Sequence, residues 1–190
     1  MSRIGKVLAL LGVRYEVYRI MVNREPSGSA PLSLAGLRVD QLERIVPPAI
    51  DELQQLNEYA GEDSIGFGAW IDGQLVAVCW YWYGERYRRE RGFIPLPDLT
   101  AKLVQVTVDP SHRGKGIAPI LIAQSSRSMS HARFKALYAR IWHSNTSSRT
   151  AFAKAGWSDA GSVITVKVPL LQRPFRFSVP RPHKGSKCAN

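Results

Sequence analysis

The sequence predicts an α/β protein, in which helices flank a mixed β-sheet. Two observations lead to this prediction. The first half of the chain contains apolar strand-like runs separated by turn signals, and from residue 103 onward the order becomes strand, loop, helix, strand, helix, strand. The chain has 190 residues, of which 45% are hydrophobic and 22% charged, so it is long enough to bury a core of ordinary composition.

In the first half, the clearest element is a hairpin. The runs 66–71 and 74–83 flank Asp72-Gly73, a dipeptide that favours a tight turn between antiparallel strands. Before it we expect a strand over 32–38, then a helix capped by Asp40 and split by Pro47-Pro48, so that a second helical stretch covers 49–59. After it, residues 84–99 are expected to form a long basic loop.

In the second half, a β-branched strand at 103–108 ends at Asp109-Pro110. Small and apolar residues recur at helical spacing after the glycines that follow, and this predicts a helix over 117–135. The remaining elements are expected to be a strand at 137–142, a short helix at 147–155 closed by Gly156, and a strand at 162–168.

The domain organisation follows from composition. Residues 1–31 are expected to form an N-terminal extension and linker, because the segment 26–31 is rich in Pro, Ser and Gly. The main domain covers 32–180, and the basic residues 181–190 form a tail with too little apolar surface to pack. The two cysteines suggest neither a disulfide framework nor a metal site, and no apolar run reaches the length of a membrane span, so a cytoplasmic protein is expected.

The net charge of +11 is unevenly distributed. Residues 26–109 hold 7 Lys or Arg and 12 Asp or Glu, whereas residues 110–158 hold 8 Lys or Arg and no acid. An anionic ligand of the second region would be attracted by this charge. Charge alone, however, fits a solvated basic face without a ligand at least as well.

The residues that point most directly to chemistry follow the strand at 103–108. Gly114 and Gly116 lie in a turn that opens a helix, where they allow the backbone to bend sharply and to approach a ligand closely. The first amides of that helix have no intrahelical acceptor and suit a phosphate, and Arg113 and Lys115 add positive charge. The spacing fits neither the Rossmann nor the Walker phosphate loop.

The pattern Arg113-x-x-Gly116-x-Ala118 resembles the pyrophosphate loop of the GNAT acyltransferase superfamily. A second segment, from Asn145 to Trp157, is similar to that family's Asn-x-x-Ala/Ser…Tyr-x-Lys-x-Gly-Phe segment. The resemblance covers roughly residues 32 to 179. It implies a mixed, mostly antiparallel central sheet flanked by helices and splayed between the strands at about 103–108 and 137–142.

The resemblance also implies roles for individual residues. Backbone groups of Val106 and Val108 would pair with the pantetheine arm of coenzyme A, and an amide near Val106 or Thr107 would stabilise the oxyanion. Asn145 would contact the pantetheine or the leaving group, or would simply cap a helix. The amides that would bind the pyrophosphate belong to a continuous segment: Arg113, Gly114, Lys115, Gly116, Ile117 and Ala118.

The sequence departs from the family at Phe152, where many members carry a tyrosine that protonates the departing thiolate. Phenylalanine cannot donate a proton, so water or another group would have to supply it, or Phe152 is simply a core residue. The general base stays unassigned. The candidates are Glu85, Glu90, Asp98 and Thr100 before the central strand, and His143, which is expected to be packed against Leu137, Ala139 and Ile141.

The run Trp80-Tyr81-Trp82-Tyr83 alternates between two faces of a strand. One pair is expected in the core. The other pair is expected either to line an acceptor pocket or to be buried under a helix.

The predicted function is therefore acyl-CoA-dependent N-acyl transfer, with acetyl-CoA or a related acyl-CoA as co-substrate, an amine as acceptor and no metal. The alternatives are a non-catalytic acyl-CoA-binding module and a basic protein that binds nucleic acid or a membrane surface. No specific nucleic acid is expected, the tail could contact an anionic surface weakly, and the protein is expected to be a monomer or homodimer. The acidic stretch 40–63 suits a cationic acceptor, whereas the arginines of 84–98 suit an anionic one.

Overall fold

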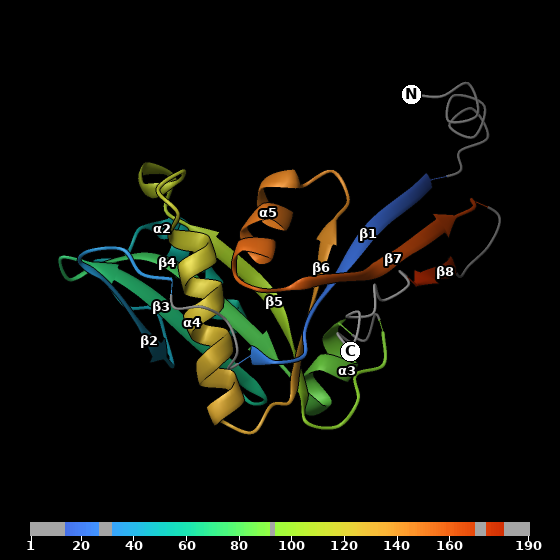
Figure 1. Cartoon of the computed structure of the whole chain (residues 1–190), viewed down its shortest axis with the longest axis horizontal. Helices are drawn as coiled ribbons and strands as arrows, with labels where there is room; N and C mark the ends of the chain where they lie inside the picture. The colour runs from blue at the N-terminus through green and yellow to red at the C-terminus, as the bar shows by residue number, and fades with distance from the viewer. Residues whose placement is uncertain (1–13, 27–31, 92–93, 170–173, 181–190) are drawn as a thin grey trace, which may run out of the picture.

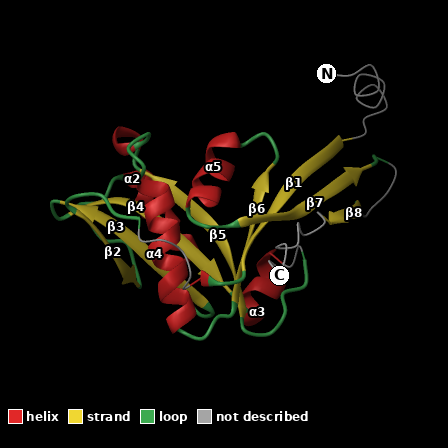
Figure 2. Ribbon diagram, viewed as in Figure 1, coloured by secondary structure: helices red, strands yellow, loops and turns green. Residues whose placement is uncertain are grey.

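The computed structural model describes residues 14–26, 32–91, 94–169 and 174–180. They form one eight-stranded sheet in the order β2-β3-β4-β5-β6-β1-β7-β8, with helices packed on it (Figures 1 and 2). The strands are β1 (Arg14–Asn23), β2 (Leu37–Leu42), β3 (Ser64–Ile71), β4 (Gln74–Trp82), β5 (Thr100–Val108), β6 (Ala136–Trp142), β7 (Ser158–Lys167) and β8 (Phe175–Pro180). Only the β5–β6 pair is parallel among the described strand pairs, so the predicted mixed, mostly antiparallel sheet is confirmed.

The helical elements vary in length, and α4 is the longest of them. They comprise α2 (Asp51–Gln54), which continues as the 3₁₀ helix η2 (Gln55–Tyr59), then α3 (Gly84–Arg91), η3 (Pro110–His112), α4 (Ile117–His131) and α5 (Thr146–Lys154). None of the helices in the described part of the chain is long and apolar enough to cross a membrane.

The hairpin predicted around Asp72-Gly73 is confirmed as β3 and β4. Asp72 has a φ of 49° and Gly73 a φ of 81°. Positive φ at both central residues is the turn geometry that matches the right-handed twist of the two strands. A local dipeptide was therefore enough to predict this part of the sheet.

Three predictions in the first half were wrong. The strand expected over 32–38 begins only at Leu37 and runs to Leu42 as β2. Asp40 does not cap a helix but lies within β2, where it pairs with Gly68 of β3. The expected loop 84–99 begins instead with the helix α3. The carboxylate of Asp63 accepts a hydrogen bond from the backbone N–H of Glu85 (2.9 Å), and Tyr87 is buried, so contacts from outside the segment stabilise this helix.

Residues 14–23 lie inside the sheet rather than beside it. Strand β1 pairs antiparallel with β6 on one side and with β7 on the other, so that Tyr18 is opposite both Trp142 and Val163. Its residues Met21 and Val22 are buried. The described part of the predicted N-terminal extension is thus an inner strand. The segment 27–31 and the predicted tail 181–190 lie outside the described residues.

The core has two layers, one on each face of the sheet. Helix α4 packs on one face together with α5, as Figure 2 shows, over a cluster that includes Tyr81 and Leu121. The other face packs against α2 and η2 through a second cluster that includes Trp80 and Trp82. The aromatic run of β4 therefore contributes to the core on both faces, which confirms burial for Trp80, Tyr81 and Trp82.

The predicted splay lies between β5 and β6. The two strands are in register only from Thr100–Leu103 against Ala136–Ala139, and beyond these residues they no longer pair. β5 remains paired with β4 as far as Val108. Among the described strands, none pairs with its other edge from Val104 onward. This free edge positions the candidate site.

Candidate functional site

A cleft of about 720 Å³ lies at the splayed ends of β5 and β6. It brings together ten of the eleven residues that the sequence predicted for ligand binding; the exception is Lys115, which does not line it. The lining residues come from α2, β5, the glycine loop, α4 and α5: Glu52, Val106, Thr107, Val108, His112, Arg113, Gly114, Gly116, Ile117, Ala118, Pro119, Ile122, Asn145, Thr146, Ser147, Ser148, Thr150, Ala151, Phe152 and Lys154.

Every second residue at the end of β5 directs its backbone N–H and C=O groups toward this cleft. The amide of Asp109 donates to the carbonyl of Val76 in β4 (2.8 Å). Because successive residues of a strand direct their N–H and C=O groups to opposite edges, those of Val108 and Val106 point to the free edge. The amide of Thr107 points toward β4.

The glycine loop begins with a tight polar turn. One carboxylate oxygen of Asp109 accepts hydrogen bonds from the amide (2.9 Å) and the hydroxyl (2.8 Å) of Ser111. The hydroxyl bond, followed by the amide bond, holds the pKa of Asp109 below its usual value. Asp109 thus stays charged and fixes the direction in which the loop leaves β5.

Both glycines of the loop have a positive φ, a backbone conformation that glycine adopts without strain. Gly114 has a φ of 79° and Gly116, the residue before α4, a φ of 80°. A Cβ built on either one would meet no atom within 4 Å, so their backbones border open space in the cleft. The first amides of α4 have no intrahelical acceptor, and Pro119 takes a position where a missing N–H costs the helix nothing.

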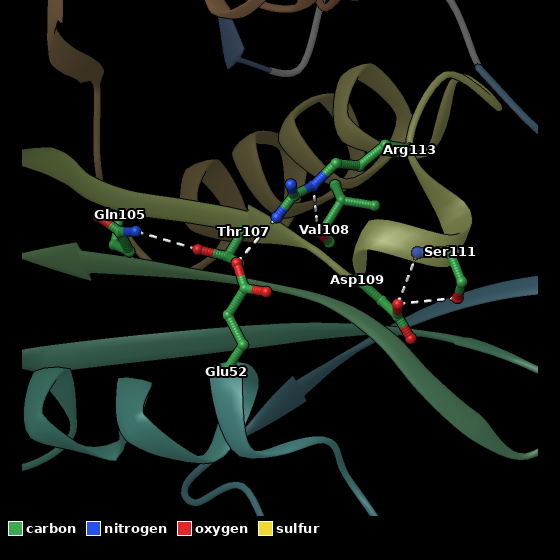
Figure 3. A network of polar contacts seen from close by, with 7 residues as sticks. All are labelled: Glu52, Gln105, Thr107, Val108, Asp109, Ser111 and Arg113. Atoms are coloured by element: carbon green, nitrogen blue, oxygen red, sulfur yellow. Dashed lines mark hydrogen bonds and ion pairs between the residues drawn. The ribbon is translucent and has the colours of Figure 1, made fainter.

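Arg113 has two partners across this mouth. Its Nε donates to the carbonyl oxygen of Val108 (3.0 Å) and its Nη2 to Oε1 of Glu52 on α2 (2.8 Å), as Figure 3 shows. Both side chains of this ion pair are about half exposed. Arg113, whose positive charge was predicted to suit the pyrophosphate, is therefore held between β5 and α2.

Asn145 caps α5. Its side-chain oxygen accepts hydrogen bonds from the amide of Ser148 (3.0 Å) and the hydroxyl of Ser147 (3.0 Å). The capping alternative is thereby shown, and Asn145 also lines the cleft. The first turn of α5 adds hydroxyls from Thr146, Ser147 and Ser148 to the same wall.

Phe152 lies on α5 with 3% of its surface exposed. Its ring meets that of Trp157 edge to face, with 4.9 Å between the centroids. It is thus a core residue that borders the cleft without offering a proton. Lys154, two residues on, supplies an ammonium group at the same wall.

The base candidates named from the sequence lie elsewhere. Asp98 and Thr100 border a second cavity of about 590 Å³, formed with α3 at the start of β5. Eight residue steps of extended strand, about 26 Å, separate Thr100 from Val108. His143 is exposed rather than packed, because β6 ends at Trp142 and the alternation of faces stops there.

Sequence reasoning missed Glu52. Of the described residues that line the cleft, it alone carries a carboxylate. It belongs to the acidic stretch 40–63, but no spacing connects it to a loop that lies 61 residues later in the chain. Only the folded sheet brings the two together.

Cys79 does not line the cleft. This side chain is fully buried in the core, where its Sγ lies 3.5 Å from the hydroxyl of Ser125. Burial raises the pKa of the Cys79 thiol to about 12. The described residues also contain no group of three or more side chains placed to hold a metal ion.

Comparison with known proteins points to one family. The family model described as the acetyltransferase (GNAT) family matches residues 34–157. The comparison with curated proteins gives no match.

Several solved structures share the fold. A tandem GNAT protein from the clavulanic acid biosynthesis pathway has a TM-score of 0.57 at 12% identity, with 87% of this chain and 58% of that chain covered. A GCN5-related N-acetyltransferase from Kribbella flavida has a TM-score of 0.55 at 14% identity, covering 87% of this chain and 63% of that one. One from Sphaerobacter thermophilus gives 0.55 at 15% identity, covering 86% and 55%. This chain thus spans less than two-thirds of the length of these structures.

Proposed function

The chain belongs to the GNAT acetyltransferase family, and from this premise we propose that it moves an acyl group, acetyl in the first instance, from coenzyme A to an amine. The observation that carries the proposal is the cleft at the splay of β5 and β6. The free edge of β5, the loop amides and the N-terminus of α4 follow one another along the chain and border the cleft, and residues of α5 line it as well.

Acyl-CoA would bind along the wall formed by β5 and α4. The pantetheine arm would add to the free edge at Val106 and Val108, as an extra strand adds to a sheet. The pyrophosphate would take the amides of the loop from Gly114 to Ala118, where the glycine backbones border open space and the dipole of α4 favours negative charge. Asn145 and the hydroxyls of α5 would form the opposite wall.

The reaction proposed is direct attack within a ternary complex. The neutral amine nitrogen forms a bond to the thioester carbon and the carbon–sulfur bond breaks. The nitrogen gives up one proton, and the departing thiolate takes up one, so that an amide and the free thiol of coenzyme A result. Of the two amides that the resemblance offered for the oxyanion, alternation along β5 favours Val106, because that of Thr107 points toward β4. Cys79 is buried away from the cleft, which argues against an acyl-cysteine intermediate there.

The proton for the thiolate cannot come from Phe152. The ammonium of Lys154 and the hydroxyls of Thr146 to Ser148 border the same cleft and are candidates for stabilising or protonating the sulfur. Thiolate is also a good leaving group, so transfer need not stop without a dedicated acid.

The acceptor proposed is a cationic amine. Glu52 places a carboxylate in the cleft, whereas Arg88 of α3 borders the second cavity, at the other end of β5. The acidic stretch 40–63 contributes a residue to the cleft and the basic segment 84–98 does not, so a cationic acceptor fits better than an anionic one.

The test is a panel of amines incubated with acetyl-CoA, with free thiol as the readout. We expect polyamines and amino acid esters to release thiol faster than amine-bearing nucleotide sugars. Release that is independent of every amine, or restricted to the anionic acceptors, would contradict the acceptor proposal. A protein without a functional cleft would release no thiol above buffer.

A second candidate function is favoured by Phe152 alone. A non-catalytic acyl-CoA-binding module would use the same loop but have no need for a proton donor. It would bind acetyl-CoA with saturation, yet show no turnover on any member of the panel.

A further inference from the structure

We propose that Arg113 and Glu52 form a latch across the mouth of the cleft, which acyl-CoA opens by taking over the guanidinium. The inference rests on the function proposed above. In this proposal, the co-substrate binds Arg113 and the acceptor binds Glu52, the two members of one ion pair.

The contacts of Arg113 place it in the path of the co-substrate. Its Nε donates to the carbonyl of Val108 (3.0 Å), one of the groups on the free edge to which the pantetheine arm would pair. Its Nη2 donates to Glu52 (2.8 Å), which fixes the guanidinium between α2 and β5 (Figure 3). One side chain thus connects the free edge of β5 with α2.

The pyrophosphate competes with Glu52 for the same guanidinium. Arginine pairs with phosphate and carboxylate oxygens through the same planar set of N–H donors, so a doubly charged group at the glycine loop is the stronger partner. Arg113 directly precedes Gly114, and its side chain is about half exposed, which leaves it room to turn toward the loop. Binding of acyl-CoA therefore breaks the ion pair between Arg113 and Glu52.

The exchange uncovers Glu52. No other carboxylate lines the cleft among the residues that the structure describes, so the released group is the natural partner for the ammonium of the acceptor. The latch predicts an order of binding, in which acyl-CoA enters first and creates the acceptor's charge partner.

The test is a double-mutant cycle on coenzyme A affinity, measured by calorimetry at low ionic strength, where an exposed pair is least screened. Glu52→Gln should tighten binding by about two- to fivefold, because an exposed ion pair of this kind no longer has to be broken. In the Arg113→Ala background, the same change should leave affinity unaltered, since there is no latch to release.

Glu58→Gln is the matched control. Glu58 lies on η2, is exposed and does not line the cleft, so its loss removes one negative charge at a similar place in the chain without touching Arg113. We expect it to leave affinity unchanged.

The outcomes separate the latch from the function on which it rests. If Glu52→Gln tightens binding equally with and without Arg113, the effect is simple charge repulsion and the latch is wrong. If Glu52→Gln leaves the affinity of the wild-type background unchanged, the latch is wrong as well. If the wild-type protein does not bind coenzyme A, the proposed function itself fails.

Discussion

Replacing Gly116 with valine should weaken acetyl-CoA binding at least tenfold, equivalent to about 1.4 kcal/mol. Gly116 directly precedes α4 with a φ of 80°, and its missing side chain leaves open space in the cleft. A branched side chain would project where the pyrophosphate has to approach the amides and would also strain a left-handed backbone. Calorimetry with the purified variant measures the loss.

Gly73→Val separates these two effects. Gly73 has a φ of 81°, and a Cβ built there would also meet no atom within 4 Å, but it lies in the hairpin turn between β3 and β4. Both variants should lose stability to backbone strain, and only Gly116→Val should lose affinity. Equal affinity of the two variants for acetyl-CoA would contradict the assignment of the loop.

Met21→Asp should lower the free energy of unfolding by at least about 3 kcal/mol, a large part of the roughly 5–15 kcal/mol that is usual for a folded protein. Met21 is 3% exposed and lies on β1 in the core cluster shared with α4. The substitution would bury an unpaired carboxylate between β6 and β7. Urea denaturation followed by circular dichroism measures the change.

Tyr15→Asp, on the same strand, serves as the control. Tyr15 is 55% exposed, so a carboxylate there should stay in water and change stability by less than about 0.5 kcal/mol. If residues 14–23 were an appendage, the two variants would behave alike. A small effect of Met21→Asp would show that β1 is not an inner strand.

The parts of the fold that sequence analysis predicted correctly are governed by local signals. The hairpin depends on Asp72-Gly73, and the start of α4 depends on Gly116, so a few neighbouring residues decide each one. The wrong predictions fall where distant residues decide. Asp40 lies in a strand because Gly68 pairs with it, and α3 forms beside the carboxylate of Asp63.

The position of β1 was beyond sequence reasoning for the same reason. Nothing in residues 14–23 specifies that β6 and β7 leave room between them, since those partners lie more than a hundred residues later. Strand pairing over such a distance depends on the whole sheet. The linker-like composition of 26–31 therefore suggested a boundary between segments that the sheet in fact joins.

The candidate site, too, has parts that a local sequence pattern reveals and parts that only the fold brings together. The loop from Arg113 to Ala118 and the segment around Asn145 could be found because each carries its pattern within a few residues, and the cleft brings them together. Glu52 and its bond to Arg113 could not, because the pair joins α2 to the glycine loop across the sheet. The acidic composition of 40–63 suggested an acceptor side but no particular residue.

The most direct test of the central claim, that acyl-CoA binds at the splay of β5 and β6, is an amide NMR titration of the labelled protein with coenzyme A. We expect saturable shifts concentrated on the amides of residues 113–118, with further shifts at Val106, Val108 and Asn145. Shifts concentrated instead at the second cavity, around Tyr83, Leu99 and Arg133, or no saturable shifts at all, would contradict it.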